Sequence, residues 1–132
     1  MITKESESVV RAYFKAVDSM QIEDLMMVFT EDASMHYPMS EPIVGRQAIR
    51  EFYLGIFERY AKGTDHIKRM FFSEDGGVAV EMLFEATLKT GKEVAFEAVD
   101  LFTIKDGKIH KIQLNYDSAK VMQEIGPPPN QQ

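Results

Sequence analysis

The spacing of apolar residues changes once along the chain, and this change constrains the fold more than any other feature. Up to about residue 63, apolar residues recur every three or four positions, which indicates amphipathic helices. Beyond that point they alternate with polar residues, which indicates strands. The turn sequences EDGG, KTGK and KDGK separate four expected strands, at 66–74, 77–89, 92–105 and 108–117. Short links between such long strands predict an antiparallel meander that curls strongly.

Three helices are expected before the sheet. They cover residues 3–19, 22–29 and 45–63. Between the second and third lies a short extended segment, ASMHY, which Pro38 stops because proline cannot donate a ladder hydrogen bond. Three helices in front of a curled antiparallel sheet predict an α+β fold, a cone whose mouth forms a pocket.

The composition fits one domain and a small ligand. The chain has 132 residues, 45% of them hydrophobic, which predicts a single domain at 1–125 and an extended C-terminal tail at 126–132, GPPPNQQ. It contains no cysteine and no run that resembles a signal peptide or a membrane span, so we expect a cytoplasmic protein that does not bind membranes. The net charge is -6, and the scattered Lys and Arg argue against nucleic acid as a partner.

Asp100 interrupts an apolar row on the third expected strand. In EVAFEAVDLFTIKDG, alternation places it on one face with Phe96, Ala98, Phe102 and Ile104. Burial there disfavours the ionised carboxylate, so the neutral acid, which can donate a hydrogen bond, is favoured. The alternative is a structural aspartate that satisfies a backbone group or an arginine.

Four segments carry a resemblance to a known family. RAYFKAVDSMQIEDL, VGRQAIREFY, EAVDLF and KIQLNYDSA follow the order of the nuclear transport factor 2-like (SnoaL-like) superfamily, and the chain is most similar to its ketosteroid isomerases. The resemblance implies the cystatin-like α+β cone of that superfamily and an oxyanion hole formed by Tyr13 and protonated Asp100. It also implies that Tyr53 orients Tyr13 through a hydrogen bond. The family often has one more tyrosine in this hydrogen-bond network, and this chain has Phe29 in its place. For both tyrosines the alternative is core packing.

The resemblance fails at the general base. The isomerases carry an aspartate at the end of the short strand, just before a proline, where this chain has Tyr37. A phenol with a pKa of about 10 is a poor base at neutral pH, so Tyr37 is expected to be a third donor or a determinant of pocket shape. Asp117 is similar to an aspartate base of some polyketide cyclases in the superfamily, but it could equally cap a terminal helical turn. His36 is expected to face away from Tyr37.

The resemblance also implies part of the pocket wall. It places the polar face of the last strand, Gln113 and Asn115, inside the pocket. The other expected lining residues are apolar, although core filling is the usual role of methionine: Phe52, Phe96, Ala98, Met35 and Met39. His66 and His110 lack the spacing of a metal site, so no metal is expected.

Together these observations predict a small-molecule enzyme of isomerase or cyclase type. It would stabilise an enolate or related oxyanion of a hydrophobic carbonyl or phenolic ligand, without a cofactor. The alternative is a non-catalytic ligand-binding or dimeric assembly module of the same fold. We expect a homodimer through the sheet, because residues assigned to its outer face would otherwise form an exposed apolar patch: Ala95, Val99, Leu101, Ile112, Leu114 and Tyr116.

Overall fold

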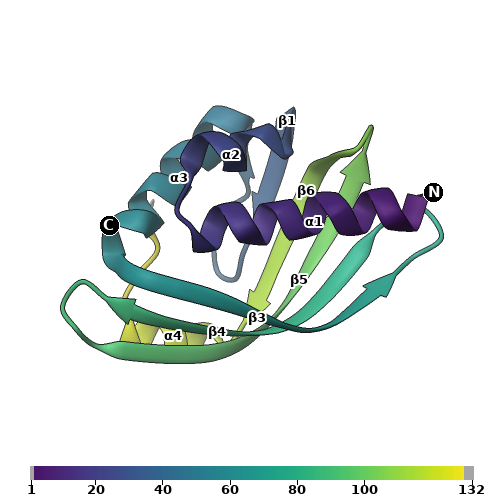
Figure 1. The fold of residues 1–132 in the computed structure, drawn as a ribbon. Coiled ribbons are helices and arrows are strands. Elements are labelled where there is room, and N and C mark those ends of the chain that lie inside the picture. Colours follow the sequence, from purple (N-terminus) through teal and green to yellow (C-terminus); the bar gives the residue numbers. More distant parts are fainter. Residues whose placement is uncertain (1, 130–132) are drawn as a thin grey trace.

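The computed structural model describes residues 2–129, in which four helices pack around one six-stranded sheet (Figure 1). The helices are α1 (Ile2–Asp18), α2 (Ile22–Met27), α3 (Arg46–Arg59) and α4 (Ser118–Glu124). The strands are β1 (Phe29–His36), β2 (Ile43–Val44), β3 (Tyr60–Phe72), β4 (Val78–Leu88), β5 (Glu93–Lys105) and β6 (Lys108–Tyr116). The predicted α+β class with a curled sheet is confirmed. The helix α4 is additional to the three that were predicted.

The sheet is mixed rather than purely antiparallel. Its strand order is β2-β1-β6-β5-β4-β3, and β3 to β6 form the predicted antiparallel meander. The strand β1 pairs with β6 in parallel, with Met35 opposite Ile112. The sequence missed this pairing because turn sequences reveal only strands that are joined by short links.

The boundary between the last predicted helix and the first long strand was placed too late. The helix was expected to reach Gly63, but α3 ends at Arg59 and β3 begins at Tyr60, which pairs with Leu88 of β4. A Cβ at Gly63 would lie 3.0 Å from the ring of Phe84, so this glycine allows close packing of the sheet rather than ending a helix. Pairing with β4 overrides the helical spacing.

The core lies between the helices and the inner face of the sheet. Figure 1 shows α1 lying across the strands, with α2 and α3 at one end. Phe29 was predicted in the second helix but is the first residue of β1, where it pairs with Ile109. The largest fully buried hydrophobic side chains come from both layers: Val10, Leu25, Phe29, Met35, Ile49, Val80, Ile109 and Ile112.

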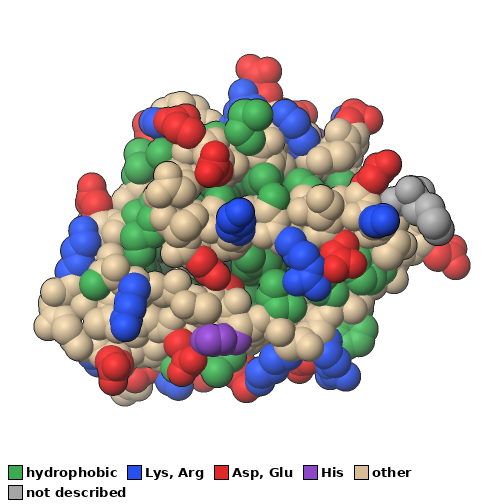
Figure 2. All heavy atoms as spheres, viewed as in Figure 1, with side chains coloured by type: hydrophobic (Ala, Val, Ile, Leu, Met, Phe, Trp, Pro, Cys, Tyr) green, Lys and Arg blue, Asp and Glu red, His purple; other side chains and the backbone are tan. Residues whose placement is uncertain are grey.

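Charges of both signs are mixed on the surface. Figure 2 shows acidic and basic side chains interspersed over the face that carries α1. This arrangement agrees with the scattered charges of the sequence. Within residues 2–129, every helix is too short or too polar to cross a bilayer.

Candidate active site

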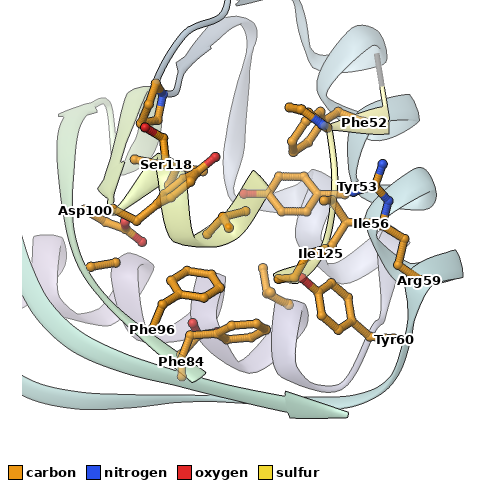
Figure 3. A pocket seen from close by; sticks show the side chains of 18 of the residues that line it. Phe52, Tyr53, Ile56, Arg59, Tyr60, Phe84, Phe96, Asp100, Ser118 and Ile125 are labelled. Atoms are coloured by element: carbon orange, nitrogen blue, oxygen red, sulfur yellow. The ribbon is translucent and has the colours of Figure 1, made fainter. Parts of the chain in front are cut away.

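A cavity of about 180 Å³ opens between the inner face of the sheet and the helices α1 and α3. The segment from α4 to residue 128 contributes its remaining wall. Its walls are mostly apolar, and besides Tyr13 and Tyr53 they include six aromatic residues: Phe14, Phe52, Tyr60, Phe84, Phe96 and Tyr116. Figure 3 shows Asp100 and Tyr53 reaching into it from opposite sides. An apolar cavity of about 150 Å³ can hold benzene, so this space suits a ligand of one or two rings.

Two tyrosine hydroxyls meet at this cavity. Tyr13 on α1 and Tyr53 on α3 are both buried, and their hydroxyl groups share a hydrogen bond. Burial, more than any other cause, raises the pKa of both phenols, so both stay neutral at physiological pH. Either hydroxyl can donate to the other. When Tyr53 donates, the proton of Tyr13 is free to point at a ligand in the cavity.

Asp100 enters the same cavity from β5. Its side chain is only 3% exposed, although it is a carboxyl group. The predicted apolar row on its face is confirmed, with Ala98 and Phe102 buried beside it. Burial raises the pKa of Asp100 to about 7, so a large fraction is the neutral acid at neutral pH. Asp100 also lies close enough to Tyr13 and Tyr53 for its charge to raise their pKa values.

A second carboxyl group in the cavity, Asp65, was missed by the sequence reasoning. It lies on β3 and lines the cavity. Because the third helix was predicted to run to Gly63 and the strand to begin at 66, Asp65 fell in an expected loop. A signal was nevertheless present. On β3, Asp65 lies between two exposed residues and on the same face as Gly63 and Ile67. Asp100 occupies the same kind of position among the apolar residues of β5.

Asp65 is coupled to Asp18 at the end of α1. The backbone N–H of Asp65 donates to both carboxylate oxygens of Asp18, at 3.2 Å each. Burial raises the pKa of Asp65 well above its ordinary value, and a hydrogen bond to the Asp18 side chain and the charges of Asp18 and Asp100 raise it further. The Oδ2 atom of Asp65 is buried and accepts no hydrogen bond from a donor in the described part of the chain.

The predicted apolar lining is partly in place. Phe52, Phe96, Ala98 and Met39 line the cavity, and Met39 does so from an exposed position at the rim. Phe29 and Met35 do not line it, because both are fully buried in the core. The ring of Phe29 instead packs edge-on against Tyr13, with the ring centroids 6.1 Å apart.

The predicted polar wall on the last strand is wrong. Residues directly opposite each other in a sheet point to the same face, and Asp100 lies opposite Leu114. Leu114 therefore lines the cavity, together with Tyr116, whereas Gln113 and Asn115 lie on the outer face. There the Asn115 side chain donates to the backbone carbonyl of Val99 at 3.1 Å. The resemblance had assigned the two faces of this strand in reverse.

Asp117 is exposed and caps a helix. Its carboxylate accepts a hydrogen bond from the backbone N–H of Lys120 at 3.1 Å, as an N-cap residue of α4 does. It does not line the cavity, whereas its neighbour Ser118 does. Of the two roles that the sequence left open for Asp117, the structure favours the cap over the base.

Tyr37 lies beside the cavity rather than in its lining. It is buried, and its ring packs on Phe52 with the centroids 5.2 Å apart. A charge on Tyr37 would also raise the pKa of Tyr116, so the two phenols are near each other. His36 shares the other face of β1 with Ser34, whose hydroxyl lies 3.3 Å from His36 Nε2. The expected opposite orientation of His36 and Tyr37 agrees with this placement.

The C-terminal segment packs over the cavity. Gly126 and Pro128 line it, and the guanidinium of Arg59 donates a hydrogen bond to the carbonyl of Pro127. A Cβ at Gly55 of α3 would lie 2.6 Å from Pro129, so the glycine makes room for this segment. The predicted tail at 126–132 is described up to Pro129, and its last three residues lie outside the described residues.

Residues 2–129 contain no group of three His, Cys, Asp or Glu side chains placed to hold a metal ion. The polar side chains that line the cavity are tyrosine hydroxyls, two aspartate carboxyls, Arg59 and Ser118. Such groups can donate hydrogen bonds and transfer protons.

The fold and cavity define an α+β cone protein with an apolar pocket. Residues 10–112 match the model of the SnoaL-like domain, and the chain belongs to this family. No curated protein matches the sequence.

Solved structures share the whole fold at low sequence identity. Bal32a from a soil-derived mobile gene cassette superposes with a TM-score of 0.84 at 20% identity, covering 94% of this chain and 98% of its own. TerC, co-crystallised with polyporic acid, superposes with a TM-score of 0.82 at 17% identity, covering 93% of this chain and 99% of its own. An LEH-like epoxide hydrolase of M. tuberculosis superposes with a TM-score of 0.80 at 16% identity, covering 93% of this chain and 90% of its own. At these identities the likeness shows a common fold.

Proposed function

We propose that this protein is an enzyme that stabilises an enolate, or a related oxyanion, of a hydrophobic carbonyl compound. The reaction would be a double-bond isomerisation or a cyclisation. The observation that carries the proposal is the presence of two groups suited to donate hydrogen bonds as neutral acids, Tyr13 and Asp100, in one apolar cavity. Their protons are available at neutral pH, and few other polar groups share the space.

The chemistry follows from where charge develops. Removing a proton beside a carbonyl group places negative charge on the carbonyl oxygen, and donors fixed in advance around that oxygen stabilise the transition state. The apolar walls strengthen these hydrogen bonds because little water competes for them. Tyr53 holds Tyr13 in place through their shared hydrogen bond. The reaction needs only proton transfers, so we propose that it uses no cofactor. We also propose that the protein acts in the cytoplasm.

The ligand class follows from the cavity. A volume of about 180 Å³ with aromatic walls favours a compact compound of one or two rings with a carbonyl or phenolic oxygen. TerC, with the same fold, was co-crystallised with polyporic acid, which supports a ring compound as ligand.

Binding of 2-naphthol and naphthalene tests this proposal. The phenolic oxygen of 2-naphthol mimics the enolate, and naphthalene has the same rings without it. Two donors predict that 2-naphthol binds at least roughly a hundredfold more tightly, since each hydrogen bond to an oxygen that carries negative charge contributes about 1.5 kcal/mol or more. Fluorescence titration measures both affinities. Equal affinities would instead favour the alternative, a non-catalytic site that binds apolar ligands.

We also propose that the protein forms a homodimer through the outer face of its sheet. Of the six residues expected in an apolar patch there, Ile112, Leu114 and Tyr116 face inward instead. Ala95, Val99 and Leu101 remain, the last two each 41% exposed. Phe71 of β3, which is 51% exposed, lies on the same face, because its partner Ala79 of β4 lies opposite Leu101. Light scattering at micromolar concentration should give twice the monomer mass. A monomer under these conditions would contradict the proposed dimer.

A further inference from the structure

A reaction that forms an enolate needs a base inside the cavity as well as donors. The described ionisable side chains that line the cavity are the tyrosines, Arg59, Asp65 and Asp100. Arg59 has no lone pair to offer, and it donates to the carbonyl of Pro127. The tyrosines at the cavity are neutral and keep their protons. The two aspartates are the remaining candidates.

Asp65 has the geometry of a proton-transfer group. The residue lines the cavity, and one of its oxygens, Oδ2, is buried and accepts no hydrogen bond from a donor among residues 2–129. A buried carboxylate oxygen without a donor costs free energy, and taking up a proton from a substrate would relieve that cost. The Asp18 carboxylate fixes the backbone of Asp65 through two hydrogen bonds.

We propose that Asp65 is the catalytic base of this cavity and that Asp18 is a positioning residue that links it to solvent. The inference rests on the proposed function. Asp65 takes a proton from the carbon beside the carbonyl group: the C–H bond breaks and an O–H bond forms at Asp65. The freed electron pair forms a C=C bond, and the carbonyl π pair moves onto oxygen, where Tyr13 and Asp100 donate. Asp65 then returns the proton to a carbon atom of the substrate.

The surroundings of the two aspartates support this division of roles. Asp65 lies next to Asp18, which is half-buried and can exchange protons with solvent, whereas Asp100 has no such neighbour. A neighbouring carboxylate raises the pKa of a carboxyl group because like charges repel, and a higher pKa makes its ionised form a stronger base. The ionisable groups that act electrostatically with Asp65 come from α1, α3, β3 and β5: Asp18, Tyr13, Tyr53, Tyr60 and Asp100.

Exchange of hydrogen for deuterium in 2-tetralone tests the base directly. This two-ring ketone has acidic hydrogens beside its carbonyl group, and NMR in D2O measures their replacement without requiring the natural substrate. Wild-type protein should accelerate the exchange, and Asp65→Asn should lower the rate at least about a hundredfold, the usual contribution of a general base. Binding of 2-naphthol should survive in Asp65→Asn. Asp106→Asn removes an exposed carboxylate and should exchange as the wild type does.

Asp18→Asn provides the second variant, because it leaves the Asp65 carboxyl in place. The asparagine Oδ1 can still accept from the backbone N–H of Asp65, but the negative charge that raises the pKa of Asp65 is gone. The exchange rate should rise with pH as Asp65 ionises and fall again above about pH 7 as Asp100 loses its donor proton. The inflection of the rising part should move to lower pH in Asp18→Asn. A purely structural role for Asp18 would leave the inflection in place.

The possible outcomes separate this inference from the proposed function. Loss of exchange in Asp65→Asn with 2-naphthol binding retained supports the assignment of the base, as does the shifted inflection in Asp18→Asn. Tight 2-naphthol binding with no exchange by the wild type overturns the base and leaves the oxyanion hole standing. An exchange rate that is unchanged in Asp65→Asn also overturns the assignment of the base and leaves the oxyanion hole standing. Loss of exchange in Asp117→Asn, with exchange retained in Asp65→Asn, does the same. Failure of 2-naphthol to outbind naphthalene overturns both.

Discussion

Replacing Tyr13 by phenylalanine is expected to weaken 2-naphthol binding about a hundredfold. The substitution removes the hydroxyl that donates to the oxyanion and leaves the buried ring in place. Loss of one such donor costs roughly 3 to 4 kcal/mol in comparable transition states, and a phenol mimic should capture most of that difference. Turnover of the natural substrate should fall at least as much. Fluorescence titration of the wild type and the variant gives the affinity ratio.

Two comparisons make the Tyr13→Phe result specific. Naphthalene should bind both proteins equally, because the ring that packs against it is unchanged. Tyr53→Phe should weaken 2-naphthol binding by only about tenfold, since Tyr53 acts through Tyr13. If Tyr13→Phe weakens naphthalene and 2-naphthol binding to the same extent, Tyr13 is a packing residue and the oxyanion hole is refuted.

Replacing Asp100 by asparagine is expected to stabilise the protein at alkaline pH. Burial raises the pKa of Asp100 from 3.8 to about 7, so between these values the folded chain holds a proton that the unfolded chain releases. The free energy of unfolding of the wild type therefore falls as pH rises through this window, by a total of about 4 kcal/mol from this group. Asparagine does not ionise, so the variant lacks this fall.

Urea unfolding at pH 4 and pH 8 measures the effect. The quantity to compare is the free energy of unfolding of Asp100→Asn minus that of the wild type. This difference should be about 4 kcal/mol larger at pH 8 than at pH 4. A difference that is the same at both pH values would mean that Asp100 titrates normally and is not held as a neutral acid. The expected gain also indicates that this carboxyl is retained at a cost in stability, as is common for functional groups.

The sequence indicated the parts of the site that lie on regular, well-separated patterns. Asp100 interrupts a long alternating row, and that row alone predicted its burial. Tyr13 and Tyr53 fall on the apolar faces of two helices, and the structure places their hydroxyls together. Alternation also predicted the long hairpins of the sheet, because glycine-containing turns mark their ends.

The remaining features depend on contacts between distant parts of the chain. Asp65 was hidden because helical spacing continues past Arg59 until pairing with β4 ends it. The inner face of β6 is fixed by its register with β5, which places Leu114 opposite Asp100. Periodicity separates two faces of a strand but does not say which one is buried. The parallel pairing of β1 with β6 likewise has no local signal.

A crystal structure of the protein with 2-naphthol bound tests the oxyanion hole most directly. The account predicts the naphthol oxygen in the cavity, at roughly 2.5 to 2.8 Å from both the Tyr13 hydroxyl and an Asp100 carboxyl oxygen, the range of strong O–H···O hydrogen bonds. An oxygen that points to solvent or to the rim, with only the rings held among the aromatic walls, would contradict it and leave a cavity that binds apolar molecules.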